Sequence, residues 1–227
     1  MVRKKFTKLS KDDTPMVRRG AAKAISIITQ DLERKYAVEF LLPIIKALLD
    51  DSNDSVKIQA VQSSIDVAKA VQDSLLVRES ILPSFNKASK NRQSWRLRFS
   101  VAEQAALLSE HLSKLAVDEE IVPLYELLLR DAEAEVRSEA IGKTPLFAKH
   151  CSSQVLIDMI LPILKEQMAT DSSQHVKGSM AQAICDLSQS LSREDTVTYV
   201  LPAVTAILKD SVTEVRVSLM QNMKKLA

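Results

Sequence analysis

Apolar residues recur along this chain at helical spacing, in blocks that short polar segments separate. Between residues 36 and 49 the apolar positions share one helix face: Val38, Leu41, Leu42, Ile45, Leu48 and Leu49. Residues 50–55 then supply turn and capping residues. A second helix face follows, with apolar residues at Val56, Ala60, Val61, Ile65, Ala68 and Val71. The pattern predicts two amphipathic helices joined by a short polar turn.

This unit repeats with a period near forty residues. Five prolines, each after a branched apolar residue, are separated by 40, 40, 39 and 40 residues: Pro43, Pro83, Pro123, Pro162 and Pro202. Pairs of an apolar and a basic residue recur in phase, with the basic members at Arg18, Lys57, Arg96, Arg137, Lys177 and Arg216. Six residues before these bases stand Asp12, Asp51, Lys90, Asp131, Asp171 and Asp210. Two registers with one period indicate stacked helix pairs, because one pair cannot bury its apolar face alone.

The period, the proline in the first helix and the aspartate six residues before the base are typical of HEAT repeats. The predicted fold is all-α: a right-handed α-solenoid of HEAT repeats, an armadillo-like superhelix. It has eleven main helices, a helical stub at residues 1–10 and no sheet. The expected repeats are 1–34 (partial), 35–73, 74–113, 114–152, 153–192 and 193–227 (partial). Because neither end carries a polar capping repeat, we expect a piece of a longer array.

One predicted second helix, from Glu133 to Lys149, contains Pro145. Proline cannot donate a backbone hydrogen bond, and its ring clashes with the preceding turn. We therefore expect a kink or break around Ile141 to Thr144.

The composition argues against several classes of function. The three glycines are isolated, so no glycine-rich phosphate loop exists. His111, His150 and His175 are scattered, and Cys151 and Cys185 are too few for a zinc site or a disulfide framework. The net charge of +2 gives weak support for nucleic-acid binding, and no stretch reaches the roughly 20 apolar residues of a membrane helix. We expect no enzyme, cofactor, metal, nucleic acid or membrane, and a reducing compartment, either cytoplasm or nucleus.

Four local strings carry a resemblance to a known family: Asp12 to Arg19, Ser94 to Arg98, Glu133 to Arg137 and Gln174 to Lys177. In order and spacing they resemble the scaffold (A) subunits of protein phosphatase 2A. The resemblance implies a non-catalytic scaffold whose intra-repeat turns line up as a ridge. It implies that the early and middle repeats hold a regulatory B-type subunit. The catalytic subunit would bind only through later repeats, outside this chain.

The resemblance also implies which residues contact the regulatory subunit: Pro15, Arg18, Arg19, Asp54, Ser94, Trp95, Arg96, Glu133, Glu135, Gln174 and His175. Trp95 occupies the place that the other units give to valine, so it either fills the core or contacts a partner. Residues 80–102 hold five basic and no acidic residues, and tryptophan and arginine are enriched at binding hot spots. A partner contact is therefore the favoured interpretation.

The recurring bases, one in each repeat, have two interpretations: a phosphate-binding stripe and an internal ladder. Aspartates in phase favour the ladder, in which bases bond aspartates of their own and the neighbouring repeat. Its members are Asp12, Arg18, Asp51, Lys57, Arg96, Asp131, Arg137, Asp171, Lys177, Asp210 and Arg216. Lys90 is expected to interrupt it, which leaves Arg96 to pair with Asp51 or Asp131. The alternative functions are a HEAT-repeat adaptor of nuclear transport or another assembly, and a DNA-binding HEAT protein.

Overall fold

The structure is a computed structural model that describes residues 2–226, and within these residues every regular element is helical. The chain divides into two compact units, residues 1–113 (unit 1) and 114–227 (unit 2). The all-helical repeat architecture expected from the sequence is confirmed. None of the described helices combines the length and apolarity that a bilayer crossing requires.

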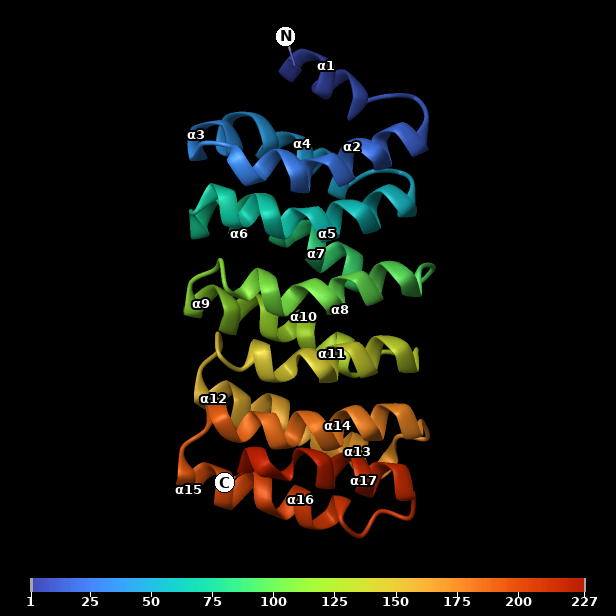
Figure 1. Ribbon diagram of the computed structural model, residues 1–227, viewed down its shortest axis with the longest axis vertical. Coiled ribbons are helices and arrows are strands. Elements are labelled where there is room, and N and C mark those ends of the chain that lie inside the picture. Colours follow the sequence, from blue (N-terminus) through green and yellow to red (C-terminus); the bar gives the residue numbers. More distant parts are fainter. Residues whose placement is uncertain (1, 227) are drawn as a thin grey trace. The chain divides into compact units, whose positions relative to one another are not determined.

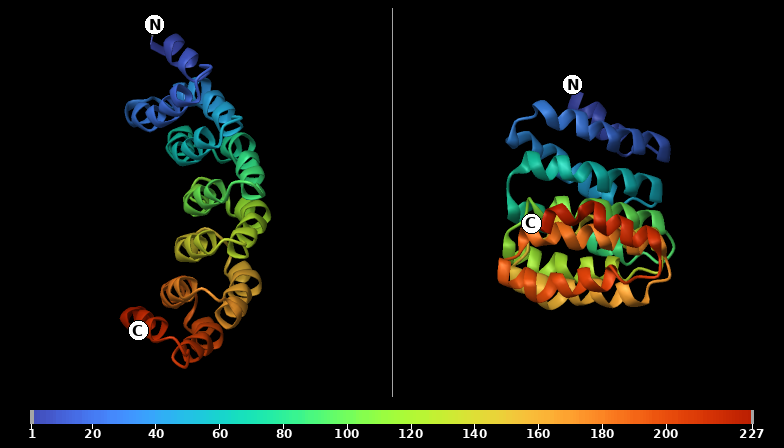
Figure 2. Two further views of the ribbon diagram at one scale, coloured as in Figure 1. Left: turned by 90° about the vertical axis from the view of Figure 1, so that its right-hand side faces the viewer. Right: turned by 60° about the horizontal axis from the view of Figure 1, so that its bottom comes forward.

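Unit 1 is built in two layers (Figures 1 and 2). Its second helices α2 (Pro15–Ile28), α5 (Asp54–Val71) and α8 (Trp95–Ser109) lie side by side. Behind them pack α4 (Leu42–Leu49) and α7 (Leu82–Ser89). The remaining elements are α1 (Val2–Leu9), η1 (Thr29–Asp31), α3 (Arg34–Tyr36), η2 (Ala37–Leu41) and α6 (Ser74–Ser80). The N-terminal ends of α2, α5 and α8 share one edge, on the right of Figure 1.

Unit 2 has the same plan. Its second helices are α11 (Ala134–Phe147), α14 (Gln174–Leu187) and α17 (Thr213–Asn222), packed in that order. Its first helices are α10 (Val122–Leu129), α13 (Leu161–Thr170) and α16 (Leu201–Ile207). The short elements are α9 (Lys114–Ala116), η3 (Val117–Ile121), α12 (Ser153–Val155), η4 (Leu156–Ile160), η5 (Ser188–Ser190), α15 (Arg193–Asp195), η6 (Thr196–Val200) and η7 (Met223–Leu226).

The recurring proline shapes each first helix. A five-residue π-helical turn, η2, η3, η4 or η6, directly precedes the helix that carries Pro43, Pro123, Pro162 or Pro202. Before Pro83, α6 ends at Ser80 and Ile81 lies in a turn. Proline lacks the N–H and clashes with the carbonyl four residues earlier, so the chain widens there. With these turns included, the described residues form five first and six second helices beside α1, as predicted.

The core lies between the two layers and between neighbouring second helices. Alanines such as Ala60, Ala68 and Ala102 are fully buried, so adjacent helices can approach closely. Tyr125 and Phe147 stack with ring centroids 4.3 Å apart, and both are fully buried. Burial raises the pKa of the Tyr125 phenol, whose hydroxyl donates to the carbonyl of Ala140.

Of the kink or break predicted around Pro145, the break is wrong, because α11 continues from Ala134 to Phe147. The Thr144 hydroxyl donates to the Ala140 carbonyl at 2.9 Å, and the Ala148 N–H donates to the Thr144 carbonyl at 2.8 Å. Phe147, two residues after the proline, is anchored in the core by its stack. This packing favours the continuous helix and offsets part of the cost of a proline in a helix interior, which is about 3 kcal/mol.

Candidate protein interface

The intra-repeat turns share one local structure. We number them first (residues 10–14), second (50–53), third (90–94), fourth (130–133), fifth (171–173) and sixth (208–212). In each turn one side-chain Oδ1 accepts a backbone N–H two residues later, at 2.8 to 2.9 Å: Asp12, Asp51, Asn91, Asp131, Asp171 and Asp210. This Asx closure turns the chain into the second helix without glycine.

A base stands four residues after each N-cap, and Arg18, Arg137 and Lys177 each bond the aspartate of the next turn. Arg18 donates through Nε and Nη2 to Asp51 of the next repeat, at 2.6 and 2.8 Å. Its Nη1 also donates to the Asp12 carbonyl of its own turn, at 2.8 Å. In unit 2, Arg137 makes the same pair of contacts with Asp171, at 2.7 and 3.1 Å. Lys177 donates to Asp210 at 3.2 Å.

These pairs are largely withdrawn from water. The side chains of Arg18 and Asp51 are 14% and 8% exposed, and those of Arg137 and Asp171 are 14% and 3% exposed. The Arg18 hydrogen bond holds the pKa of Asp51 below its usual value. For Asp171, burial raises the pKa, but hydrogen bonds from Arg137 and the Ser173 N–H, together with the charges of Arg137 and Lys177, lower it by more. The contacts bind repeat to repeat, which occupies the bases and leaves little of them to a phosphate.

The third turn departs from this pattern, and the register expected from the sequence is wrong there. Asn91, not Lys90, makes the Asx closure, and Arg98, not Arg96, donates to the carbonyl of that residue, at 2.7 Å. The N-cap is Ser94, so Arg98 stands four residues after it, like Arg18 after Thr14. This turn is one residue longer than the second, which shifts the helix start relative to the proline.

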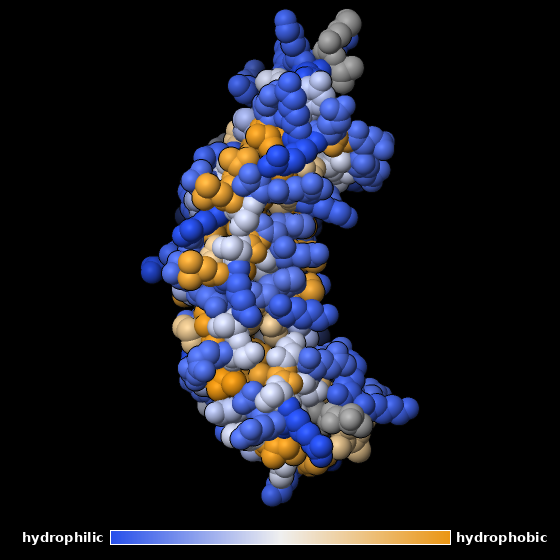
Figure 3. Space-filling model, turned by 90° about the vertical axis from the view of Figure 1, so that its left-hand side faces the viewer, coloured by the Kyte–Doolittle hydropathy of each residue, from blue (hydrophilic) through white to orange (hydrophobic). Residues whose placement is uncertain are grey.

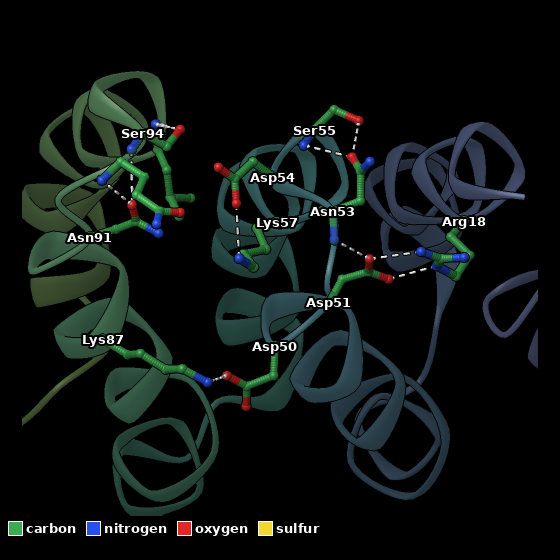
Figure 4. A network of polar contacts seen from close by, with 12 residues as sticks. Arg18, Asp50, Asp51, Asn53, Asp54, Ser55, Lys57, Lys87, Asn91 and Ser94 are labelled. Carbon is green, nitrogen blue, oxygen red and sulfur yellow. Dashed lines mark hydrogen bonds and ion pairs between the residues drawn. The ribbon is translucent and has the colours of Figure 1, made fainter.

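The neutral amide of Asn91 changes the neighbouring repeat as well. Lys57 has the ladder position of α5, yet its Nζ donates at 2.9 Å to Asp54 of its own helix (Figure 4). This bond is the main cause of the lowered pKa of Asp54. Lys87 and Asp50 form a more exposed pair at 3.0 Å between the same two repeats. The second and third turns are thus joined without a buried carboxylate.

Trp95 is the first residue of α8 and does not occupy the valine position. That position belongs to Leu97, which is 1% exposed. The indole is half-buried, edge-to-face with Phe99 at 6.4 Å, and the Arg96 guanidinium lies 4.6 Å from its centroid. Core filling is therefore done by Leu97, and one part of the indole faces solvent.

The other predicted contacts of unit 1 differ in availability. Arg19 is exposed and Pro15 is half-buried at the start of α2. Ser94 caps α8 by accepting the Leu97 N–H at 3.4 Å, and Asp54 is paired with Lys57. Arg18 is committed to the ladder. The side chains that the fold leaves available are those of Arg19, Trp95 and Arg96.

In unit 2 the predicted contacts lie at two helix starts. Glu133 and Glu135 are exposed at the beginning of α11, and Gln174 and His175 are exposed at the beginning of α14. Arg216, at the sixth turn, donates to the carbonyl of Asp210 in its own repeat.

No group of three or more His, Cys, Asp and Glu side chains that could hold a metal occurs in the described part of the chain. Cys151 and Cys185 are buried free thiols, and burial raises the pKa of Cys151 to about 11.

On the opposite edge, where successive repeats connect, apolar side chains are interspersed with hydrophilic ones (Figure 3). Leu75, at the start of α6, is 58% exposed. Asp73 caps this helix and also receives Arg34 at 3.1 Å. Scattered apolar residues of this kind are normal on a protein surface.

The fold and the bonded turns define the class: this is a HEAT-repeat protein. Residues 116–192 match the family model described as a PPP2R1A-like HEAT repeat. The beta isoform of the human 65 kDa regulatory A subunit of serine/threonine-protein phosphatase 2A is 34% identical over 108 residues, which are 46% of this chain and 18% of that protein. The regulatory A subunit of protein phosphatase PP2A from Schizosaccharomyces pombe is 26% identical over 119 residues, which are 52% of this chain and 20% of that protein.

These matches confirm the resemblance to the A subunits of protein phosphatase 2A that the local strings indicate. The chain spans about a fifth of the length of these relatives. Among solved structures, a mutant of Kap121p has a TM-score of 0.76 at 15% identity, covering 97% of this chain and 22% of that one. A designed armadillo repeat protein has a TM-score of 0.62 at 17% identity and covers both chains fully. At such low identities these two structures show the fold alone.

Proposed function

We propose that this chain is a non-catalytic scaffold segment of a protein phosphatase 2A complex, and that its intra-repeat turns hold a regulatory B-type subunit. The observation that carries the proposal is that some side chains at the turns of unit 1 are bonded between repeats and others are not. Arg18 and Asp51 bond to each other and so link one repeat to the next. Arg19, Trp95 and Arg96 remain available on the same edge for contact with a partner.

The available residues have the chemistry of an interface. Tryptophan and arginine are over-represented among residues whose truncation weakens a complex most. Trp95 is held by Phe99 and Arg96, so little conformational entropy is lost when a partner covers it. The similarity to A subunits supports the same partner class, and the proposed location is the cytoplasm or nucleus, in keeping with two free thiols.

Co-purification tests the proposal. The chain is mixed with purified regulatory and catalytic subunits of the phosphatase, separately and together. We expect the regulatory subunit to be retained and the catalytic subunit not to be retained by itself. Retention of the catalytic subunit in the absence of the regulatory one would contradict the assignment of partners.

A double variant tests the residues. Trp95→Ala with Arg19→Ala should weaken binding of the regulatory subunit by more than about 2 kcal/mol. The matched control, Leu75→Ala with Lys35→Ala, removes a large apolar and a basic side chain from the opposite edge of unit 1 and should leave affinity unchanged. Circular dichroism verifies folding. A folded double variant with unchanged affinity would show that these turns are not the interface.

A further inference from the structure

The third turn is the one place in unit 1 where the intra-repeat edge is purely basic. Residues 80–102 carry five basic and no acidic side chains, in a chain whose net charge is only +2. The first and second turns, in contrast, contain Asp12, Asp13, Asp50 and Asp51.

The charges of this turn are not neutralised by the fold. Lys90, Arg92 and Arg96 are exposed, and none of them has a carboxylate partner among the contacts of residues 2–226. The acidic residues of the second turn are already occupied. Asp50 receives Lys87 and Asp51 receives Arg18, while Asp54, the first residue of α5, receives Lys57. Excess positive charge therefore faces solvent around the half-buried indole of Trp95.

We propose that the third-turn surface, formed by Lys90, Arg92, Trp95 and Arg96, binds an acidic, loop-like or extended segment of a protein partner. Guanidinium groups bind carboxylates in bidentate geometry. Opposite charge steers the segment to the surface, and the indole face supplies apolar contact area beside it. The inference deepens the proposed function and rests on it for the kind of partner: the regulatory subunit would present carboxylates to this turn.

Trp95 reports directly on this surface, because it is the single tryptophan of the chain. The probe is a synthetic peptide that alternates glutamate and serine, titrated into the whole chain while tryptophan emission is followed. We expect a saturable change of emission, and an affinity at least about tenfold lower when salt rises from about 50 to about 500 mM. A lysine–serine peptide of equal length should produce no change.

Charge reversal gives the decisive comparison. Arg92→Glu with Arg96→Glu should weaken binding of the acidic peptide at least about tenfold. Folding should persist, because acidic residues near a helix N-terminus are favourable. The control, Lys35→Glu with Lys46→Glu, changes net charge equally elsewhere in unit 1 and should retain the affinity.

Three outcomes overturn the inference. These are no response to the acidic peptide at low salt, equal weakening in both double variants, and binding of a single-stranded DNA of equal charge as tightly as the peptide. The last would assign the surface to phosphates. If the chain retains the regulatory subunit but does not bind the acidic peptide, this inference alone is refuted. Failure of that retention, with peptide binding intact, would refute the proposed function and leave the chemistry of the surface standing.

Discussion

Asn91→Asp should restore the missing rung of the ladder and stabilise unit 1. Asn91 already makes the Asx closure of the third turn, so the change replaces one amide with a carboxylate of the same shape. Lys57 holds in its repeat the place that Lys177 holds three repeats later, and Lys177 donates to Asp210 at 3.2 Å. Lys57 should therefore leave Asp54 and bond the new carboxylate.

The magnitude follows from the burial of the groups. The Lys57 side chain is 20% exposed, and the side chains of the analogous pair Lys177 and Asp210 are 17% and 10% exposed. A hydrogen bond to a charged group of this kind contributes at least about 1.5 kcal/mol. Release of the more exposed Lys57–Asp54 pair costs about 0.5 kcal/mol. The net gain is about 1 kcal/mol, or about 2 to 4 °C in the melting temperature.

Thermal and denaturant unfolding measure this gain, and a double-mutant cycle with Lys57→Met isolates the pair. Gln93→Glu is the matched control, since it adds the same charge at an exposed position of the same turn. The gain should vanish when acid protonates the new carboxylate. A stability increase that survives in the Lys57→Met background, or that Gln93→Glu reproduces, would refute the assignment of Asn91 to the ladder.

Three further predictions concern the ladder and the helix proline. Asp51→Asn keeps the Asx closure but removes the carboxylate from Arg18, so the free energy of unfolding should fall by about 2 kcal/mol in urea titrations; an unchanged value would show that the pair contributes nothing. The pKa values of Asp51 and Asp171 are lowered in the fold, so their stabilisation is complete above the ordinary value of 3.8 and is lost as the pH falls through the lowered values. Melting curves between neutral pH and about pH 2 should show this loss, and the pH dependence should be smaller in Asp51→Asn. Pro145→Ala should raise stability by about 1 to 2 kcal/mol because α11 gains a backbone hydrogen bond; a destabilised variant would show that the proline ring is needed for packing.

The repeat architecture could be predicted from the sequence because its signals are local and periodic. The apolar faces, the prolines about forty residues apart and the turn aspartates each act within one repeat, and each determines one element. The pairing of Arg18 with Asp51 also follows from period and charge, since the next repeat presents the same turn beside it. Candidate interface residues such as Arg19 could be named from a resemblance, because the strings that carry it lie at the turns and at the starts of the second helices.

Where local spacing changes, only the tertiary structure determines the register of a helix and the partners of its side chains. One additional residue in the third turn shifts the start of α8, so Asn91 and Arg98 take the places that strict periodicity gives to Lys90 and Arg96. The N-cap Ser94 was the available signal, because counting from the cap rather than from the proline gives the correct register. Pro145 is tolerated for a similar reason. Phe147 packs on Tyr125, a residue of another helix, and the energy of that contact cannot be read from the spacing of either. Periodicity determines which elements form, whereas packing between elements determines their register and which side chains remain free to bind.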